Sequence, residues 1–185
     1  LDSTVVESDK DAAKKSYKGV FGYNPVLAWL AEPDVFLAGV FRDGNAAPQA
    51  NLLPLLRHCY RRLPKDIPLR LRSDSAGYRL DVIDFCHRHG IEFAIGIDLD
   101  NAVREAIDKI PEKHWRILVR DGDTYLFAET IHVPGGGNNA YDLPAFRLIV
   151  TRRVTGQLDL FEDPIKTRAI ISSLPASLKT EEVLE

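Results

Sequence analysis

The stretch Leu69-Arg-Leu-Arg-Ser-Asp-Ser-Ala-Gly-Tyr78 decides how this chain is expected to fold. Residues 69–73 alternate apolar and polar side chains, which is the period of a strand. Small residues after Asp74 suit a tight exit from that strand. Residues 79–90 then place apolar side chains at helical spacing and close on Gly90. Asp74 is therefore predicted at the carboxyl end of a strand, directly before a helix, where open α/β sheets bind ligands.

Position alone favours a simpler role for Asp74, in which its carboxylate only accepts hydrogen bonds from backbone amides of the turn. A second acid, Asp2, has a similar setting at the very start of the chain. Because two acids share this setting, the alternative to test is that both have a functional role.

The composition is that of a water-soluble globular protein with one domain, or one domain with a sizeable insertion. The chain has 185 residues, a net charge of -3 and 45% hydrophobic residues. No stretch resembles a signal peptide or a membrane span. Cys59 and Cys86 lack metal-site or redox-motif spacing, so they are predicted to be reduced, packed thiols of a cytoplasmic protein. A near-neutral charge is untypical of a dedicated nucleic-acid binder, but an enzyme that gathers carboxylates around metal ions can carry basic patches within it.

The order of expected elements matches a ribonuclease-H-like core, an α/β fold with a mixed sheet and flanking helices. We expect a strand over residues 1–7, a charged loop over 8–16, and an antiparallel hairpin of residues 23–31 and 35–41. A helix from about Pro48 to Leu63, the strand before Asp74, a helix to His89 and a strand over 91–97 follow. That last strand is mostly apolar and suits a buried parallel position. Asp100 or Asn101 is expected to cap a short helix that reaches Ile110.

From Trp115 onward the pattern predicts strands only, at residues 115–120, 124–133, 146–154 and 167–172, with turns at 121–123, 135–139 and 155–156. We therefore expect a core over residues 1–112 that begins inside its first strand, a β-meander insertion over 113–175, and the start of a truncated helix over 176–185. The absence of Met and the opening Leu-Asp lead us to expect a fragment of a longer protein.

A core of this type places its first and fourth strands side by side, so Asp2 and Asp74 are expected to be neighbours on the strength of the fold analogy. Two carboxylates form a hard-oxygen site suited to Mg²⁺ or Mn²⁺. Two such ions ~3.5–4 Å apart can activate a nucleophile and stabilise the leaving oxygen of a phosphodiester. A third carboxylate usually completes such a cage.

Four segments resemble bacterial insertion-sequence transposases of the DDE type, in the order that the family has them. They are Leu1-Asp-Ser-Thr4, Lys18-Gly-Val-Phe-Gly-Tyr-Asn-Pro25, Arg42-Asp-Gly-Asn45 and Arg72-Ser-Asp-Ser-Ala-Gly-Tyr78. The closest likeness is to the group whose ribonuclease-H-like core carries a β-rich insertion before the last acid. The resemblance implies two-metal cleavage and strand transfer at transposon ends, with double-stranded DNA as partner and a homodimer in the synaptic complex. It also implies that the protein is nucleoid-associated when bound to DNA.

The resemblance implies that Asp2 and Asp74 match the first two acids of the catalytic triad. The third acid of that group is a Glu in a Tyr-x-x-Arg-x-x-x-Glu pattern, and neither Tyr125 nor Tyr141 has an Arg three residues later. Glu181 and Glu182 come too early to match. We therefore expect the third acid beyond residue 185, and a fragment that binds metal weakly and transfers no strand alone.

Several alternatives remain open at this point. Lys14, Lys15, Tyr17 and Lys18, near the first acid, and Arg79, just past the second, are candidates for phosphate contacts, and each can equally be solvated surface. Asp98 and Asp100 can join a metal site, although capping of a helix is favoured. A ribonuclease-H-like nuclease or resolvase without strand transfer, and a catalytically dead DNA-binding remnant, are the alternative functions.

Overall fold

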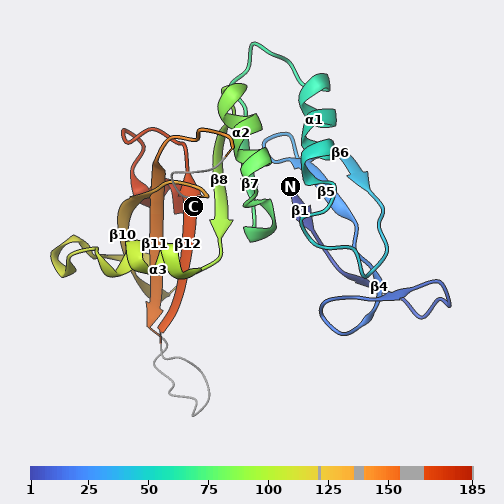
Figure 1. The fold of residues 1–185 in the computed structure, drawn as a ribbon, viewed down its shortest axis with the longest axis horizontal. Helices are drawn as coiled ribbons and strands as arrows, with labels where there is room; N and C mark the ends of the chain where they lie inside the picture. The colour runs from blue at the N-terminus through green and yellow to red at the C-terminus, as the bar shows by residue number, and fades with distance from the viewer. Residues whose placement is uncertain (121, 136–139, 155–164, 185) are drawn as a thin grey trace. The chain divides into compact units, whose positions relative to one another are not determined.

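The computed structural model describes residues 1–120, 122–135, 140–154 and 165–184, and it shows a mixed α/β protein (Figure 1). The α/β prediction is confirmed at this level. The chain forms two compact units, Leu1–Ile91 and Glu92–Glu185. None of the described helices combines the length and hydropathy that a bilayer-spanning segment needs.

The first unit contains two small antiparallel sheets. One has the order β1-β5-β6, formed by Asp2–Ser3, Val26–Leu30 and Val35–Val40, and includes the predicted hairpin. The other has the order β2-β4-β3, formed by Val6–Glu7, Phe21–Tyr23 and Lys14–Lys15.

The predicted strand over residues 1–7 and the predicted loop over 8–16 were therefore wrong. The first is two short strands in two different sheets, and the second contains β3. Gly22 explains this local arrangement, because an added Cβ would lie 2.1 Å from the Val6 carbonyl oxygen. Only glycine allows β2 to approach β4 this closely.

Helix α1, Leu52–Arg62, buries Leu52, Leu55, Leu56 and Cys59 and packs against β5 and β6. The prediction that it begins near Pro48 was wrong. Asn51 has a φ of 62°, outside the right-handed helical region. The carbonyls of Ala47, Pro48 and Ala50 accept hydrogen bonds from Arg42, so a tertiary contact occupies the segment that the pattern assigned to a first helical turn.

Strand β7, Arg70–Ser73, leads through the short 3₁₀ helix η1, Ser75–Gly77, into α2, Leu80–Arg88. The predicted strand and helix around Asp74 are thus confirmed, with η1 inserted between them. Tyr60 of α1 meets Phe85 of α2 edge to face at 5.5 Å between ring centroids. Cys59 and Cys86 are free and buried, as predicted, and burial raises the pKa of the Cys86 thiol to about 12.

The second unit is built on an antiparallel sheet of order β8-β12-β11-β10-β9. Its strands are β8, Glu92–Ile97; β9, Arg116–Arg120; β10, Asp123–His132; β11, Phe146–Val154; and β12, Ile165–Ser172. The predicted β meander is confirmed as a run of strands. Within this unit the neighbour of β8 is β12, which runs antiparallel to it with Ala169 opposite Ile97.

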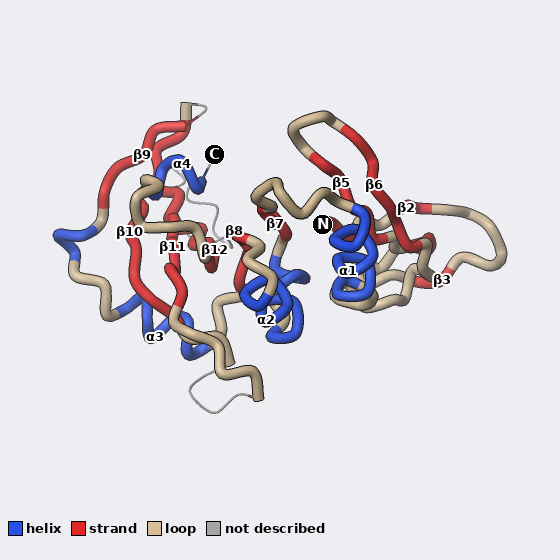
Figure 2. Tube along the Cα trace, turned by 90° about the horizontal axis from the view of Figure 1, so that it is seen from above, coloured by secondary structure: helices blue, strands red, loops and turns tan. Residues whose placement is uncertain are grey.

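Two helices and a 3₁₀ turn complete this unit. Helix α3 is Asn101–Asp108, η2 is Glu112–His114 and α4 is Thr180–Leu184. Asp100 caps α3 by accepting a hydrogen bond from the Val103 amide at 2.9 Å, so the capping role favoured by the sequence is confirmed. Helices α3 and α4 lie on opposite sides of the sheet (Figure 2). The predicted turns at 136–139 and 155–156, and residue Asp121, lie outside the described residues.

Two buried serines give a matched test of hydrogen bonding. Ser172, fully buried, donates to the Phe93 carbonyl at 3.0 Å and accepts from the Leu174 amide at 3.1 Å. The buried Ser73 hydroxyl has no hydrogen-bond partner among the described residues.

Ser172→Ala is expected to lower the free energy of unfolding by about 1–3 kcal/mol, because the Leu174 amide loses its acceptor. Ser73→Ala is expected to leave it unchanged or raise it. Denaturant unfolding of both variants checks this, and equal losses would contradict it.

The segment before α4 is fastened to the sheet through Glu129. Arg147 donates to both Glu129 carboxylate oxygens, at 3.1 and 2.8 Å, and to the Pro175 carbonyl at 2.9 Å. The Thr180 hydroxyl donates to the same carboxylate at 2.8 Å. Burial raises the pKa of Glu129, but the hydrogen bonds from Arg147 and Thr180 outweigh it and hold that pKa below its ordinary value.

This depressed pKa predicts a pH-dependent contribution to stability. A carboxyl group whose pKa is lower in the folded state stabilises the fold above its unfolded pKa of about 4.3, and the contribution is lost as the pH falls through the folded pKa. The difference in unfolding free energy between the parent and Glu129→Gln is therefore expected to be largest above about pH 5 and to shrink below about pH 4. Urea unfolding from pH 7 to pH 3 measures it, and a constant difference would contradict the assignment.

Candidate active site

Asp74 lies where the sequence placed it, directly after β7. Its backbone is extended, and its side chain caps η1 by accepting a hydrogen bond from the Ala76 amide at 3.1 Å. The local capping role is therefore real. It engages Oδ1 only, and the side chain is exposed. The cap orients the carboxylate and leaves its second oxygen accessible to a ligand.

Asp2 lies on β1, opposite Leu27 of β5, and is also exposed. The Leu1 amino group donates a hydrogen bond to the Arg72 carbonyl at 2.8 Å, which joins the start of β1 to the end of β7. Both views show the N-terminus beside β7 (Figure 1, Figure 2). Asp2 and Asp74 each follow this contact by one or two positions along their own segments.

The electrostatics of the Leu1 amino group report on both carboxylates. Burial lowers the pKa of this amino group, while Asp2 and, to a smaller extent, Asp74 raise it. Asp2 and Asp74, far apart in the sequence, thus both lie near the Leu1 nitrogen. Both side chains are exposed carboxylates, the kind of oxygen ligand that a hard divalent ion prefers. In the described part of the chain, no group of three or more His, Cys, Asp or Glu side chains is arranged to hold a metal.

Comparison with known proteins identifies the family. A family model described as Transposase DDE domain group 1 matches residues 1–174. The chain belongs to this family of transposase DDE domains. The resemblance found in the sequence is thereby confirmed, and DNA is the partner that the family implies. No curated protein matches the chain.

The candidate DNA-contacting residues of this transposase domain differ in their surroundings. Lys15 lies on β3 and Lys18 in the turn that follows, both exposed, with the Lys18 ammonium 5.8 Å from the centroid of the Tyr17 ring. Arg79 precedes α2 and donates to both carboxylate oxygens of Asp81, at 2.9 and 2.7 Å. The hydrogen bond from Arg79 is the largest cause of the lowered pKa of Asp81.

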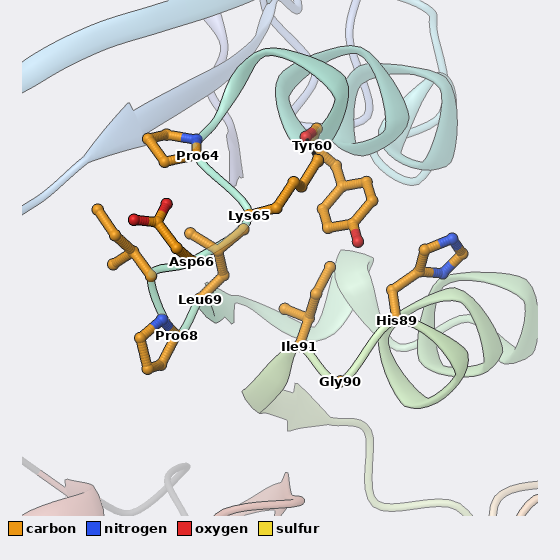
Figure 3. Close-up of a pocket in the computed structure, with 10 residues that line it drawn as sticks. Tyr60, Pro64, Lys65, Asp66, Pro68, Leu69, His89, Gly90 and Ile91 are labelled. Atoms are coloured by element: carbon orange, nitrogen blue, oxygen red, sulfur yellow. Dashed lines mark hydrogen bonds between the residues drawn. The ribbon is translucent and has the colours of Figure 1, made fainter.

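A hollow in the same unit lies apart from the two acids of the transposase domain. It is lined by residues from the end of α1, the connection to β7 and the end of α2 (Figure 3). The Lys65 ammonium lies 3.3 Å from the centroid of the Tyr60 ring and also donates to the Tyr60 carbonyl. His89 Nδ1 lies 2.8 Å from the Phe85 carbonyl oxygen. Both basic side chains are thus engaged within the protein, and neither Asp2 nor Asp74 lines the hollow.

Sequence reasoning missed a polar network under β1. Asn24, fully buried, and Arg42, 6% exposed, meet the Ser3 hydroxyl. Asn24 and Arg42 stand in two of the segments that carry the family resemblance, but no local pattern marks them as buried. Their residue types predict surface positions, so only the fold reveals the contact.

Proposed function

We propose that this domain is the catalytic core of a DDE transposase in which Asp2 and Asp74 hold Mg²⁺ or Mn²⁺, two ions being expected in the intact enzyme. The observation that carries the proposal is the hydrogen bond from the Leu1 nitrogen to the Arg72 carbonyl, which brings the start of β1 and the end of β7 together. It supports the side-by-side arrangement of first and fourth strands in a ribonuclease-H-like core. The core is proposed to span residues 1–112, the β-rich insertion 113–175, and the start of the next helix 176–185.

The chain's own residues act by holding and orienting. The Ala76 amide donates a hydrogen bond to Oδ1 of Asp74 and so orients this exposed carboxylate. The pairing of β1 with β5 fixes the backbone of Asp2. When bound, the divalent ions neutralise charge on the phosphodiester and activate the attacking oxygen. The third acid of the family pattern matches no residue of this chain, so we propose that it follows α4.

Binding of Mn²⁺ tests the metal role directly. A ligand that binds only the folded state raises the unfolding temperature. Mn²⁺ is therefore expected to raise the midpoint of thermal unfolding of the parent and to have no effect on Asp2→Asn plus Asp74→Asn. Asp108→Asn is the matched control, because Asp108 is an exposed acid at the end of α3 and belongs to none of the candidate metal ligands. An equal shift in all three proteins, or no shift in the parent, would contradict the proposal.

For DNA, we propose that Lys15 and Lys18 contact phosphates and that Arg79 contributes beside the second acid, with a homodimer forming in the synaptic complex. Each phosphate contact adds about 0.9 to the slope of log affinity against log salt concentration. Lys15→Ala and Lys18→Ala are expected to weaken DNA binding and to reduce this slope by about one each. Lys113→Ala, at an exposed position on η2, is the control in a fluorescence-anisotropy titration. A slope that stays at the parent value would contradict the assignment.

A further inference from the structure

The guanidinium of Arg42 is buried among neutral acceptors. It donates to the carbonyls of Asn24 at 2.6 Å, Ala47 and Pro48 at 3.2 Å each, and Ala50 at 2.5 Å. Its Nη2 donates to the Ser3 hydroxyl at 2.7 Å. Burial lowers the pKa of Arg42, and every acceptor that the structure shows is an uncharged oxygen. Removing such a charge from water is unfavourable, and among the described residues no carboxylate pairs with Arg42 to offset that cost.

The Ser3 hydroxyl is held from two sides. It accepts from Arg42 and donates to Asn24 Oδ1 at 2.8 Å, while the Asn24 amide nitrogen donates to the Ala46 carbonyl at 2.9 Å. The Arg42 guanidinium can only donate, so the Ser3 oxygen accepts from it. The Ser3 hydroxyl hydrogen is then free to donate to Asn24 Oδ1, which can only accept. Ser3 is thereby tied to the segment that precedes α1.

Strand β1 is only two residues long, so its pairing with β5 does little to fix the register between the two strands. Asp2 lies opposite Leu27 and Ser3 opposite Val26. Successive side chains of a strand point to opposite faces, and a slip of one residue exchanges the faces. With Ser3 anchored under the strand, Asp2 is placed on the other face, where its side chain is exposed.

We propose that Arg42 is a positioning residue that, through the Ser3 hydroxyl, fixes the register of β1 and so the face on which Asp2 binds metal. The inference rests on the proposed metal-binding role of Asp2. Setting register is the best-attested use of a buried polar or ionic group. The proposal also connects two of the segments that carry the family resemblance. Lys18–Pro25 contains Asn24 and Arg42–Asn45 begins with Arg42, and both side chains form hydrogen bonds with the Ser3 hydroxyl.

Replacing Ser3 by residues of matched shape separates the hydroxyl from its volume. Ser3→Thr keeps the hydroxyl, and Ser3→Val has the same branched outline without it. Loss of a group that orients a metal ligand typically lowers metal affinity about 10–100-fold. Ser3→Val is therefore expected to weaken Mn²⁺ binding at least about tenfold, and Ser3→Thr is expected to bind Mn²⁺ about as tightly as the parent. Electron paramagnetic resonance of free Mn²⁺ measures the affinity. Ser16→Ala, which removes a buried hydroxyl without a partner among the described residues, is the control and is expected to bind as the parent does.

The outcomes separate this inference from the proposed function. If the parent binds Mn²⁺ and Ser3→Val binds it equally well, or if Ser3→Thr is as weak as Ser3→Val, the positioning role is overturned and the metal site stands. If the parent binds no Mn²⁺, the proposed function falls and the inference with it. If Ser3→Val does not fold, Asn24→Ala, which removes the acceptor of the Ser3 hydroxyl, must show the same loss, and parent-like affinity overturns the inference.

Discussion

In a transposase that contains this domain, Asp2→Asn and Asp74→Asn are each expected to lower the rate of DNA strand cleavage by about a thousandfold or more. A bound divalent ion supplies several kcal/mol of charge stabilisation in the transition state, and every 1.36 kcal/mol is a factor of ten in rate. The amide keeps the shape of each side chain and removes its charge. Binding of DNA is expected to persist, because the lost carboxylates repel phosphate.

Single-turnover cleavage of a labelled transposon end, together with an electrophoretic binding assay, checks this prediction. Asp108→Asn is the control, since Asp108 is an exposed acid at the end of α3 and is none of the candidate metal ligands. Full cleavage by either Asp2→Asn or Asp74→Asn would remove that residue from the active site. A parallel loss of DNA binding would instead indicate a defect in folding or in the DNA surface.

Arg42→Met is expected to lower the free energy of unfolding by about 3–5 kcal/mol, a large effect for a single substitution. Methionine fills much of the same space but donates no hydrogen bond. The carbonyls of Asn24, Ala47 and Ala50 and the Ser3 hydroxyl would then lose a buried donor, and each unsatisfied group is unfavourable by about 1–3 kcal/mol before relaxation.

Denaturant unfolding monitored by tryptophan fluorescence measures this change. Arg61→Met, at an exposed position in the last turn of α1, is the control and is expected to change stability by less than about 1 kcal/mol. Arg42→Lys separates charge from geometry: an ammonium offers three donors without the planar fork, so it is expected to recover only part of the loss. A loss for Arg42→Met no larger than for Arg61→Met would show that the network contributes nothing to folding.

The sequence predicted the long elements well, because their periodicity is set by local burial. Helix α2 and strands β10, β11 and β12 are each long enough for a pattern to show. The strands of two or three residues near the N-terminus are too short for any period to be recognised. Their existence depends on a close approach at Gly22, which is a property of the folded backbone.

The candidate site divides in the same way. The place of Asp74 after β7 could be predicted because a strand, an acid and small turn residues follow one another in the sequence. Asp2 was proposed from its similar setting, the fold analogy and the family resemblance, and the role of both acids stays a prediction. Arg42, by contrast, reaches Ser3 across 39 positions, and no local signal announces such a contact. For the same reason the start of α1 was misplaced, since hydrogen bonds from Arg42 hold the preceding segment out of the helix.

Whether Asp2 and Asp74 share one ion is tested most directly by Mn²⁺ binding to the parent, both single Asn variants and the double variant, followed by electron paramagnetic resonance. Two residues that hold the same ion have non-additive effects. We predict that each single variant loses most of the binding and that the double variant loses little more. Additive losses, with each single variant retaining an ion of its own, would show that the two carboxylates serve separate sites.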